Sequence, residues 1–263
     1  MLPRWDPSSL EKMLPCNCAL IGSRRSGKST LQTYLLKNHL EKHFDCIISF
    51  TGSVSCSDEL REFFVKRGKS HLMFDRLNSR FLETLQRQQE AQKIQTGRAR
   101  SVLLLLDDAL MENSTIAELG IFTTRARHYN VSIMSCSVSF TSISKNFRLS
   151  LDVAFFFKLG MWSDKKLLLQ EFTSSPQLVE YSHAELKEFE CIVQEKNFKN
   201  GTFVFSINYD TPSSHEGTLS FQDDSHSVSS LENQTQDFPI ECDTLSEENK
   251  MDYSEKGESY EDS

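Results

Sequence analysis

The sequence lacks the cysteine patterns of a metal site: its seven cysteines stand at irregular spacings, with no C-x-x-C pair and no Cys/His cluster. Such cysteines are typical of reduced thiols in a cytosolic or nuclear compartment. The first 15 residues carry four charged side chains instead of the apolar run of a signal peptide. No stretch approaches the roughly 18 apolar residues of a membrane span. We therefore expect a soluble protein that is not secreted and has no membrane partner.

Positive charge is scarce at the carboxyl end of the chain. Residues 209–263 contain 15 Asp or Glu side chains against Lys250 and Lys256, a net charge of −13, so the −8 of the whole chain leaves +5 for residues 1–208. The acidic segment has few aliphatic residues and cannot bury enough apolar surface to offset the entropy of ordering. We predict one domain at 1–208 and a disordered acidic tail at 209–263. A mildly basic domain suits nucleic acid but is also common among ordinary enzymes.

Residues 1–208 contain no internal repeat, and short apolar runs alternate there with longer amphipathic stretches. The short runs predict buried strands at 16–21, 46–50, 102–106, 131–136 and 153–157. The longer stretches predict helices at 28–42, 58–66, 75–95, 114–128, 164–172 and 183–194, followed by a late strand at 202–208. Strands that alternate with helices imply an α/β fold, a three-layer sandwich whose central sheet is mainly parallel and covered on both faces.

The most specific motif is G-x-x-x-x-G-K-S at 22–29, where the first predicted strand runs directly into a helix. Glycines let backbone N–H groups surround phosphates, and the helix amino terminus adds a favourable dipole. In such a P-loop, or Walker A motif, Lys28 bridges the β- and γ-phosphates of ATP and the Ser29 hydroxyl reaches Mg²⁺. Arg24 and Arg25 either contact phosphate or DNA, or are solvated residues of the loop. The predicted nucleotide-binding residues are Gly22, Ser23, Arg24, Arg25, Ser26, Gly27, Lys28, Ser29 and Thr30.

Two carboxylates follow the apolar run at 102–106. We predict that Asp107 completes a Walker B strand and holds magnesium opposite Ser29. Asp108 is placed either to polarise the attacking water or to cap a helix or turn. The predicted strand at 46–50 separates the phosphate loop from this magnesium strand along the sequence, which favours the ATPase division of P-loop proteins. No guanine-reading N-K-x-D segment follows, which argues against a GTPase.

Over roughly residues 15–157, the chain resembles the genome-packaging ATPases of poxviruses, giant viruses and Polinton/Maverick elements, in the HerA/FtsK superfamily. The segment R-H-Y-N-V-S-I at 127–133 is similar to the Arg-His segment that precedes the fourth strand of that family. The segment N-F-R-L-S-L-D at 146–152 resembles the approach to the fifth strand, with Ser150 where Asn is usual. These two segments are moderately specific signals of that family.

The resemblance implies a homo-oligomeric ring that uses ATP and Mg²⁺ to drive double-stranded DNA into a capsid, with a capsid or portal protein as a further partner. It places the protein in a cytoplasmic virus factory, the nucleus or the virion. By the same pattern Arg127 is a candidate finger for the nucleotide of a neighbouring subunit; Arg125 and Arg148 compete for that role, and an ordinary surface arginine is the alternative. The family usually has a polar sensor, commonly Gln, at the end of the fourth strand, where this chain offers only Ser137 or Ser139.

Two other functions fit the same residues. A small-molecule or nucleotide kinase uses a phosphate loop and its lysine similarly. A nucleotide-binding protein without turnover is compatible with the missing sensor Gln. Asp108, the extra strand at 46–50 and the arginine segments favour the ATP-hydrolysing motor over a kinase. Measured hydrolysis would exclude a protein without turnover.

Overall fold

The computed structural model describes residues 2–52, 58–69, 72–109, 111–171, 186–187, 189–196 and 201–207. The predicted acidic tail at 209–263 lies outside the described residues, so the division of the chain after residue 208 stays a prediction. Within the described part, no helix combines the length and the apolar character needed to cross a membrane.

Eight strands of the described part form one sheet in the order β3-β2-β4-β5-β1-β6-β7-β8. The strands are β1 (Asn17–Ile21), β2 (Cys46–Thr51), β3 (Met73–Phe74), β4 (Val102–Asp107), β5 (Val131–Ser137), β6 (Val153–Phe156), β7 (Glu190–Glu195) and β8 (Gly201–Ser206). All pairs from β3 to β6 in this order are parallel, whereas β7 pairs antiparallel with both β6 and β8. The predicted α/β fold with a mainly parallel sheet is confirmed.

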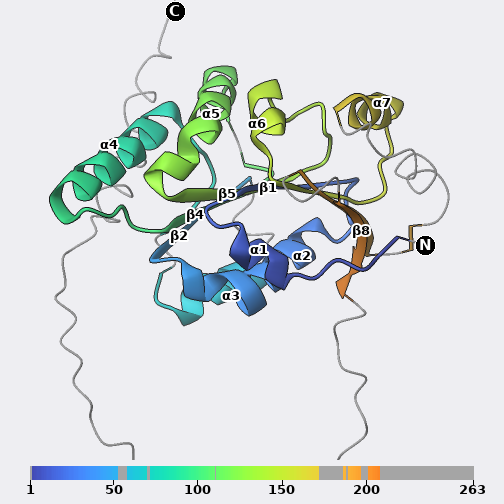
Figure 1. The fold of residues 1–263 in the computed structure, drawn as a ribbon, viewed down its shortest axis with the longest axis horizontal. Coiled ribbons are helices and arrows are strands. Elements are labelled where there is room, and N and C mark those ends of the chain that lie inside the picture. Colours follow the sequence, from blue (N-terminus) through green and yellow to red (C-terminus); the bar gives the residue numbers. More distant parts are fainter. Residues whose placement is uncertain are drawn as a thin grey trace, which may run out of the picture.

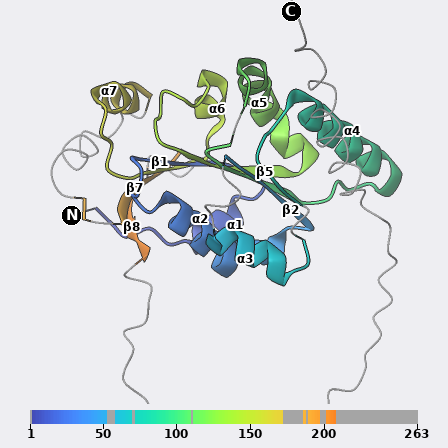
Figure 2. The same cartoon turned by 180° about the vertical axis from the view of Figure 1, so that it is seen from behind.

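Helices cover both faces of this sheet, as predicted for a three-layer sandwich (Figure 1). One face carries α1 (Ser8–Lys12), α2 (Lys28–Leu35) and α3 (Asp58–Lys66). The other carries α4 (Ser79–Thr96), α5 (Asn113–Arg125), α6 (Lys145–Ser150) and α7 (Trp162–Glu171). Figure 2 shows the same two helical layers from behind. After α2 the chain continues through a π-helical turn, Leu36–Leu40, and a 3-10 turn, Glu41–His43, so the helical stretch predicted at 28–42 is confirmed.

One predicted helix is wrong. Of the stretch at 183–194, residues 190–194 belong to strand β7, and residues 183–185 and 188 lie outside the described part. β7 is buried along its whole length because it lies between β6 and β8, and this pairing outweighs the local pattern. The two-residue strand β3 was not predicted, since it is too short to show a period.

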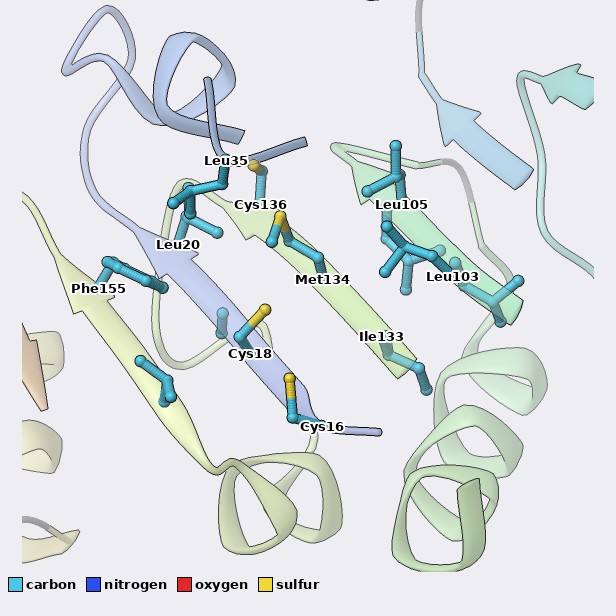
Figure 3. Packing of buried hydrophobic residues seen from close by; sticks show 14 of the residues in the cluster. Cys16, Cys18, Leu20, Leu35, Leu103, Leu105, Ile133, Met134, Cys136 and Phe155 are labelled. Atoms are coloured by element: carbon cyan, nitrogen blue, oxygen red, sulfur yellow. The ribbon is translucent and has the colours of Figure 1, made fainter. Parts of the chain in front are cut away.

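The phosphate-loop helix α2 is packed onto the centre of the sheet. Strands β1 and β5 are in register, with Cys18 opposite Met134 and Leu20 opposite Cys136. Leu35 of α2 lies over Leu20 and Cys136 (Figure 3), and these five side chains are almost completely buried. Close packing of this kind resists displacement, so the start of α2 is held in a fixed position relative to the ends of β1 and β5. The five cysteines of the described part are all buried and form no disulfide.

Candidate nucleotide-binding site

The predicted phosphate loop connects β1 to α2 at the carboxyl edge of the sheet. The backbone N–H of Gly22 donates to the carbonyl oxygen of Ser137, 3.2 Å away at the end of β5. A Cβ atom added at Gly22 would lie 2.5 Å from Cβ of Phe157, so the loop approaches the end of β6 more closely than any side chain permits. Gly27 has a left-handed φ of 98° immediately before α2. Both glycines of the motif are therefore required by the backbone.

Lys28 points its ammonium group into this loop. The residue is only 6% exposed, and Nζ donates hydrogen bonds of 3.0 Å to the carbonyl oxygens of Gly22 and Ser23. The Ser26 Oγ atom is enclosed by protein and has no hydrogen-bond partner among the described residues. A buried hydroxyl without a partner is unfavourable unless a ligand or water satisfies it. A buried cation beside an unsatisfied hydroxyl and a helix amino terminus is the arrangement that binds phosphate.

Ser29 and Asp107 meet across the site. The Ser29 hydroxyl donates to the Asp107 carboxylate, with distances of 3.0 Å to Oδ2 and 3.3 Å to Oδ1. Burial raises the pKa of Asp107 above its ordinary value, and the hydrogen bond from Ser29 opposes this rise. The Cys136 thiol also donates to this carboxylate, because Asp107 and Cys136 are register partners in β4 and β5. Asp107 is thus a buried carboxylate with its oxygens directed towards the start of α2.

Asp108 follows directly but has a different environment. Its side chain is exposed, and its backbone has a left-handed φ of 47°. A non-glycine residue in this conformation costs roughly 1–3 kcal/mol, and such residues cluster at active sites. Asp108 also lines a cavity of about 270 Å³ between the ends of β4 and β5 and helices α5 and α6. The two adjacent carboxylates are therefore separated into a buried one and a solvent-accessible one.

Neither a protein-family model nor a curated protein matches this sequence. Solved structures do match the fold. The DNA-packaging ATPase B204 from Sulfolobus Turreted Icosahedral Virus superposes with a TM-score of 0.52 at 15% sequence identity, over 73% of this chain and 97% of B204. The genome packaging NTPase B204 from Sulfolobus turreted icosahedral virus 2, in complex with AMPPCP, gives 0.50 at 13% identity, over 76% and 98% of the two chains.

A third solved structure extends the comparison. EssC (ATPases 2 and 3) from Geobacillus thermodenitrificans superposes with a TM-score of 0.50 at 11% identity, over 72% of this chain and 39% of EssC. The chain has the fold of these ATPases. The expected α/β fold of P-loop ATPases is therefore confirmed, and at these identities the likeness is one of fold alone.

The order of strands in this P-loop fold refines one inference from the sequence. The strand that separates the phosphate-loop strand β1 from the predicted magnesium strand β4 in space is β5. The strands that separate them along the chain are β2 and β3, and both lie on the far side of β4. Order along the chain and order in the sheet differ because parallel strands are joined by crossovers.

Other predicted residues of the P-loop lie at its surface. Arg24, Arg25 and Thr30 are exposed, and Arg25 adopts a left-handed φ of 61°. The Ser23 backbone N–H and hydroxyl both donate to the carbonyl oxygen of Lys158, each at 3.4 Å. Ser23 thus ties the loop to the segment that follows β6, whereas the arginine side chains of the loop are exposed.

The candidate finger Arg127 lies far from the P-loop of its own chain. Its guanidinium group forms an ion pair with the buried carboxylate of Asp152. Asp152 in turn accepts a hydrogen bond from the backbone N–H of Asn17, at the amino end of β1. The phosphate loop follows the carboxyl end of the same strand, five residues or roughly 16 Å away. A role for Arg127 in trans stays a prediction, and a role in its own P-loop is incompatible with this placement.

The two competing arginines have separate environments. Arg148 is 9% exposed, and its guanidinium group is bound to Glu171 through contacts of 3.0 Å. Because Arg148 belongs to α6 and Glu171 to α7, this ion pair connects the two helices. Arg148 also donates to the carbonyl oxygen of Ile143. Arg125 is exposed and lines a groove of about 260 Å³ between α4 and α5. Arg148 therefore has a structural role, whereas the guanidinium group of Arg125 faces solvent.

The last residue of β5 and the residues after it form a local network that the sequence did not reveal. The Ser137 hydroxyl donates to the carbonyl oxygen of Ser139 and contacts the Ser142 hydroxyl at 2.6 Å. The Ser139 hydroxyl donates to the buried carboxylate of Asp164 in α7 at 2.7 Å. Neither serine contacts Asp107 in these bonds; the neighbouring Cys136 does. No sequence signal identifies this thiol, because its contact depends on the register of β4 and β5.

Proposed function

We propose that this protein is an ATP-hydrolysing motor that translocates double-stranded DNA, with genome packaging as its role. One observation carries the proposal: Lys28 and the Ser29–Asp107 pair meet at the carboxyl edge of the sheet, in a fold shared with packaging ATPases. B204 is described as a DNA-packaging ATPase, and its homologue was solved with the ATP analogue AMPPCP.

The residues of this chain fit the chemistry of phosphoryl transfer to water. Lys28 exchanges the carbonyl oxygens of Gly22 and Ser23 for phosphate oxygens, and the unsatisfied Ser26 hydroxyl donates to the same group. The loop N–H groups and the dipole of α2 stabilise negative charge as it develops. Asp108, accessible to solvent at the end of β4, orients the attacking water and accepts its proton.

The donor set also fits magnesium. Mg²⁺ prefers hard oxygen ligands and is usually bound by one or two protein groups together with substrate phosphates. Ser29 Oγ and Asp107 Oδ2 are such ligands and lie 3.0 Å apart. When bound, the ion would neutralise phosphate charge. Burial disfavours the charged form of Asp107, and a divalent cation would favour it.

Assembly and location are further parts of the proposal. A homo-oligomeric ring would bring Arg127 of one subunit towards the nucleotide of the next, and a positive charge of +5 over residues 1–208 suits DNA inside the ring. A capsid or portal protein is the proposed docking partner. The proposed location is a virus factory in the host cytoplasm, the nucleus or the virion.

The decisive experiment is ATP hydrolysis by the purified full chain with and without double-stranded DNA. We expect turnover that rises with double-stranded DNA and falls at least about 100-fold in Lys28→Ala, because the ammonium group no longer stabilises the transition state. Lys37→Ala, the same substitution at an exposed lysine of the following helical turn, is the matched control and should keep full activity.

The other outcomes separate the alternative functions. Phosphate transfer to a small molecule or nucleotide, with no response to DNA, would identify a kinase. Nucleotide binding without turnover would identify a binding protein. Hydrolysis in Lys28→Ala at the wild-type rate would overturn the site itself.

A further inference from the structure

Phe189 lies in a tight turn that precedes β7. Its φ of 63° is left-handed, a conformation that a bulky residue adopts only when the surrounding structure imposes it. The turn is closed by two hydrogen bonds: the Glu190 N–H donates to the Lys187 carbonyl oxygen at 3.1 Å, and the Lys187 N–H donates to the Glu190 carboxylate at 3.0 Å. Glu190 is buried, so the turn is anchored to the sheet. The hydrogen bonds of this turn and the buried start of β7 thus hold the Phe189 backbone in an unfavourable conformation.

This turn places the Phe189 ring against the phosphate loop. A Cβ atom added at Gly27 would lie 2.8 Å from Cδ1 of Phe189 and 3.6 Å from Cε1 of Phe157. The ring therefore approaches the loop backbone at the residue directly before Lys28, and only glycine permits this approach. Phe189 is nevertheless 36% exposed, which is unusual for an aromatic side chain packed against a central glycine. The exposed part of the ring is apolar surface next to the phosphate-binding backbone.

The order of the strands places this ring on one side of the loop and the carboxylates on the other. In the sheet, Asp107 ends β4 and Asp108 follows it, two strands from β1. Phe189 precedes β7, which is two strands from β1 in the opposite direction. A triphosphate seated in the loop must direct its terminal phosphate towards the carboxylates. The opposite end of the nucleotide then extends towards β6 and β7, where Phe189 lies.

We propose that Phe189 is the platform on which the base of the bound nucleotide stacks. This inference rests on the proposed nucleotide site and adds a residue that positions the base to those that hold the phosphates. Aromatic rings stack on the π-faces of bases without selecting one base over another. A platform that is fixed before binding loses little conformational freedom when the base arrives. The strained turn provides this fixed position.

The test compares ATP with inorganic tripolyphosphate, which carries the phosphates without the base. Binding of each ligand to the full chain is measured by titration calorimetry for the wild type, Phe189→Leu and Phe189→Trp. We expect Phe189→Leu to weaken ATP binding about tenfold, the size of a lost stacking contact, and to leave tripolyphosphate binding unchanged. Leucine keeps an apolar side chain against Gly27, and melting curves check that the variant is folded.

Phe189→Trp supplies an independent signal. It should retain the affinity of the wild type for ATP, and its fluorescence should be quenched by ATP but not by tripolyphosphate. The wild-type protein, which contains two tryptophans, is the control for this signal.

Several results would overturn the platform. They are unchanged ATP affinity in Phe189→Leu, an equal loss for both ligands, and equal quenching of Phe189→Trp by both. Equal loss would mean that the ring only supports the loop. A wild-type protein that binds neither ligand would instead overturn the proposed function, and with it the platform.

Discussion

Ser29 and Asp107 are 78 residues apart in the sequence, and the hydroxyl of the first donates a 3.0 Å hydrogen bond to the carboxylate of the second. This bond joins the start of α2 to the end of β4 across the intervening strand β5. It brings together the two oxygen ligands that the sequence assigns to magnesium. The same geometry separates Asp107 from Asp108, whose side chain is exposed, so the two carboxylates should differ in function.

The pair of variants Asp107→Asn and Asp108→Asn tests this difference. Asp107→Asn should abolish the tightening of ATP binding by Mg²⁺, because the buried ligand loses its charge. Asp108→Asn should keep magnesium-dependent binding and slow hydrolysis by roughly 10²- to 10⁴-fold, the usual contribution of a general base. Nucleotide affinity with and without Mg²⁺ and single-turnover hydrolysis measure the two effects. Loss of magnesium-dependent binding in Asp108→Asn would mean that the roles are reversed.

Arg127→Ala tests a finger that acts in trans. The variant should bind ATP normally and hydrolyse it about 10³- to 10⁵-fold more slowly, since the transition state of the neighbouring subunit lacks a positive charge. Mixing it with Lys28→Ala subunits should restore part of the activity, because a Lys28→Ala subunit lends its arginine to an intact loop next door.

Two controls belong to the Arg127 experiment. Arg127 is paired with buried Asp152, so unfolding curves must show that the variant is folded. Arg125→Ala removes an exposed arginine two residues away and separates a finger from a general loss of positive charge. If mixtures of folded, co-assembled subunits stay at the level of the separate proteins at every ratio, Arg127 is not a finger.

Gly22→Ala should destabilise the domain. The new methyl group would lie 2.5 Å from Cβ of Phe157, and overpacking of this kind costs about 1–3 kcal/mol of the free energy of unfolding. Gly160→Ala is the matched control, since a Cβ atom there meets nothing within 4 Å and should change stability by less than about 0.5 kcal/mol. Urea unfolding of the two variants gives the comparison. Equal stability of both would show that the loop moves away from β6 freely.

Glu11, a residue of α1, should make the free energy of unfolding depend on pH. Hydrogen bonds from His43, Lys42 and His39 lower the pKa of Glu11 from its ordinary value of 4.5 to about 2. Because the pKa is lower in the folded protein, the stabilisation is fully present above pH 4.5 and is lost as the pH falls towards 2. The wild type should therefore be more stable than Glu11→Gln at neutral pH, and the difference should shrink across this interval. A difference in unfolding free energy that stays constant from pH 6 to pH 2.5 would contradict the assignment.

Local sequence patterns predicted the glycine loop before α2 and the buried strand that ends at Asp107. The spacing of Gly22, Gly27 and Lys28 specifies a loop whose backbone can surround phosphate, and the apolar run before Asp107 specifies a buried strand. Both patterns depend on residues close together in the chain, so both could be read without the structure. The parallel α/β class followed from the same local alternation of strands and helices.

Tertiary structure alone decided the remaining features. Strand β7 was predicted as a helix because its pairing with β6 and β8 leaves no local signature. Because that segment was predicted as a helix, the turn at Phe189 before β7 was not predicted either. The Phe189 ring lies against Gly27, 162 positions away in the sequence, so no local pattern could indicate the contact. The Cys136–Asp107 contact and the Arg127–Asp152 pair likewise depend on which strands lie side by side. The hydrophobic periodicity of a segment indicates which of its side chains are buried. Which strands pair with one another depends on the packing of the whole domain, and no single segment encodes it.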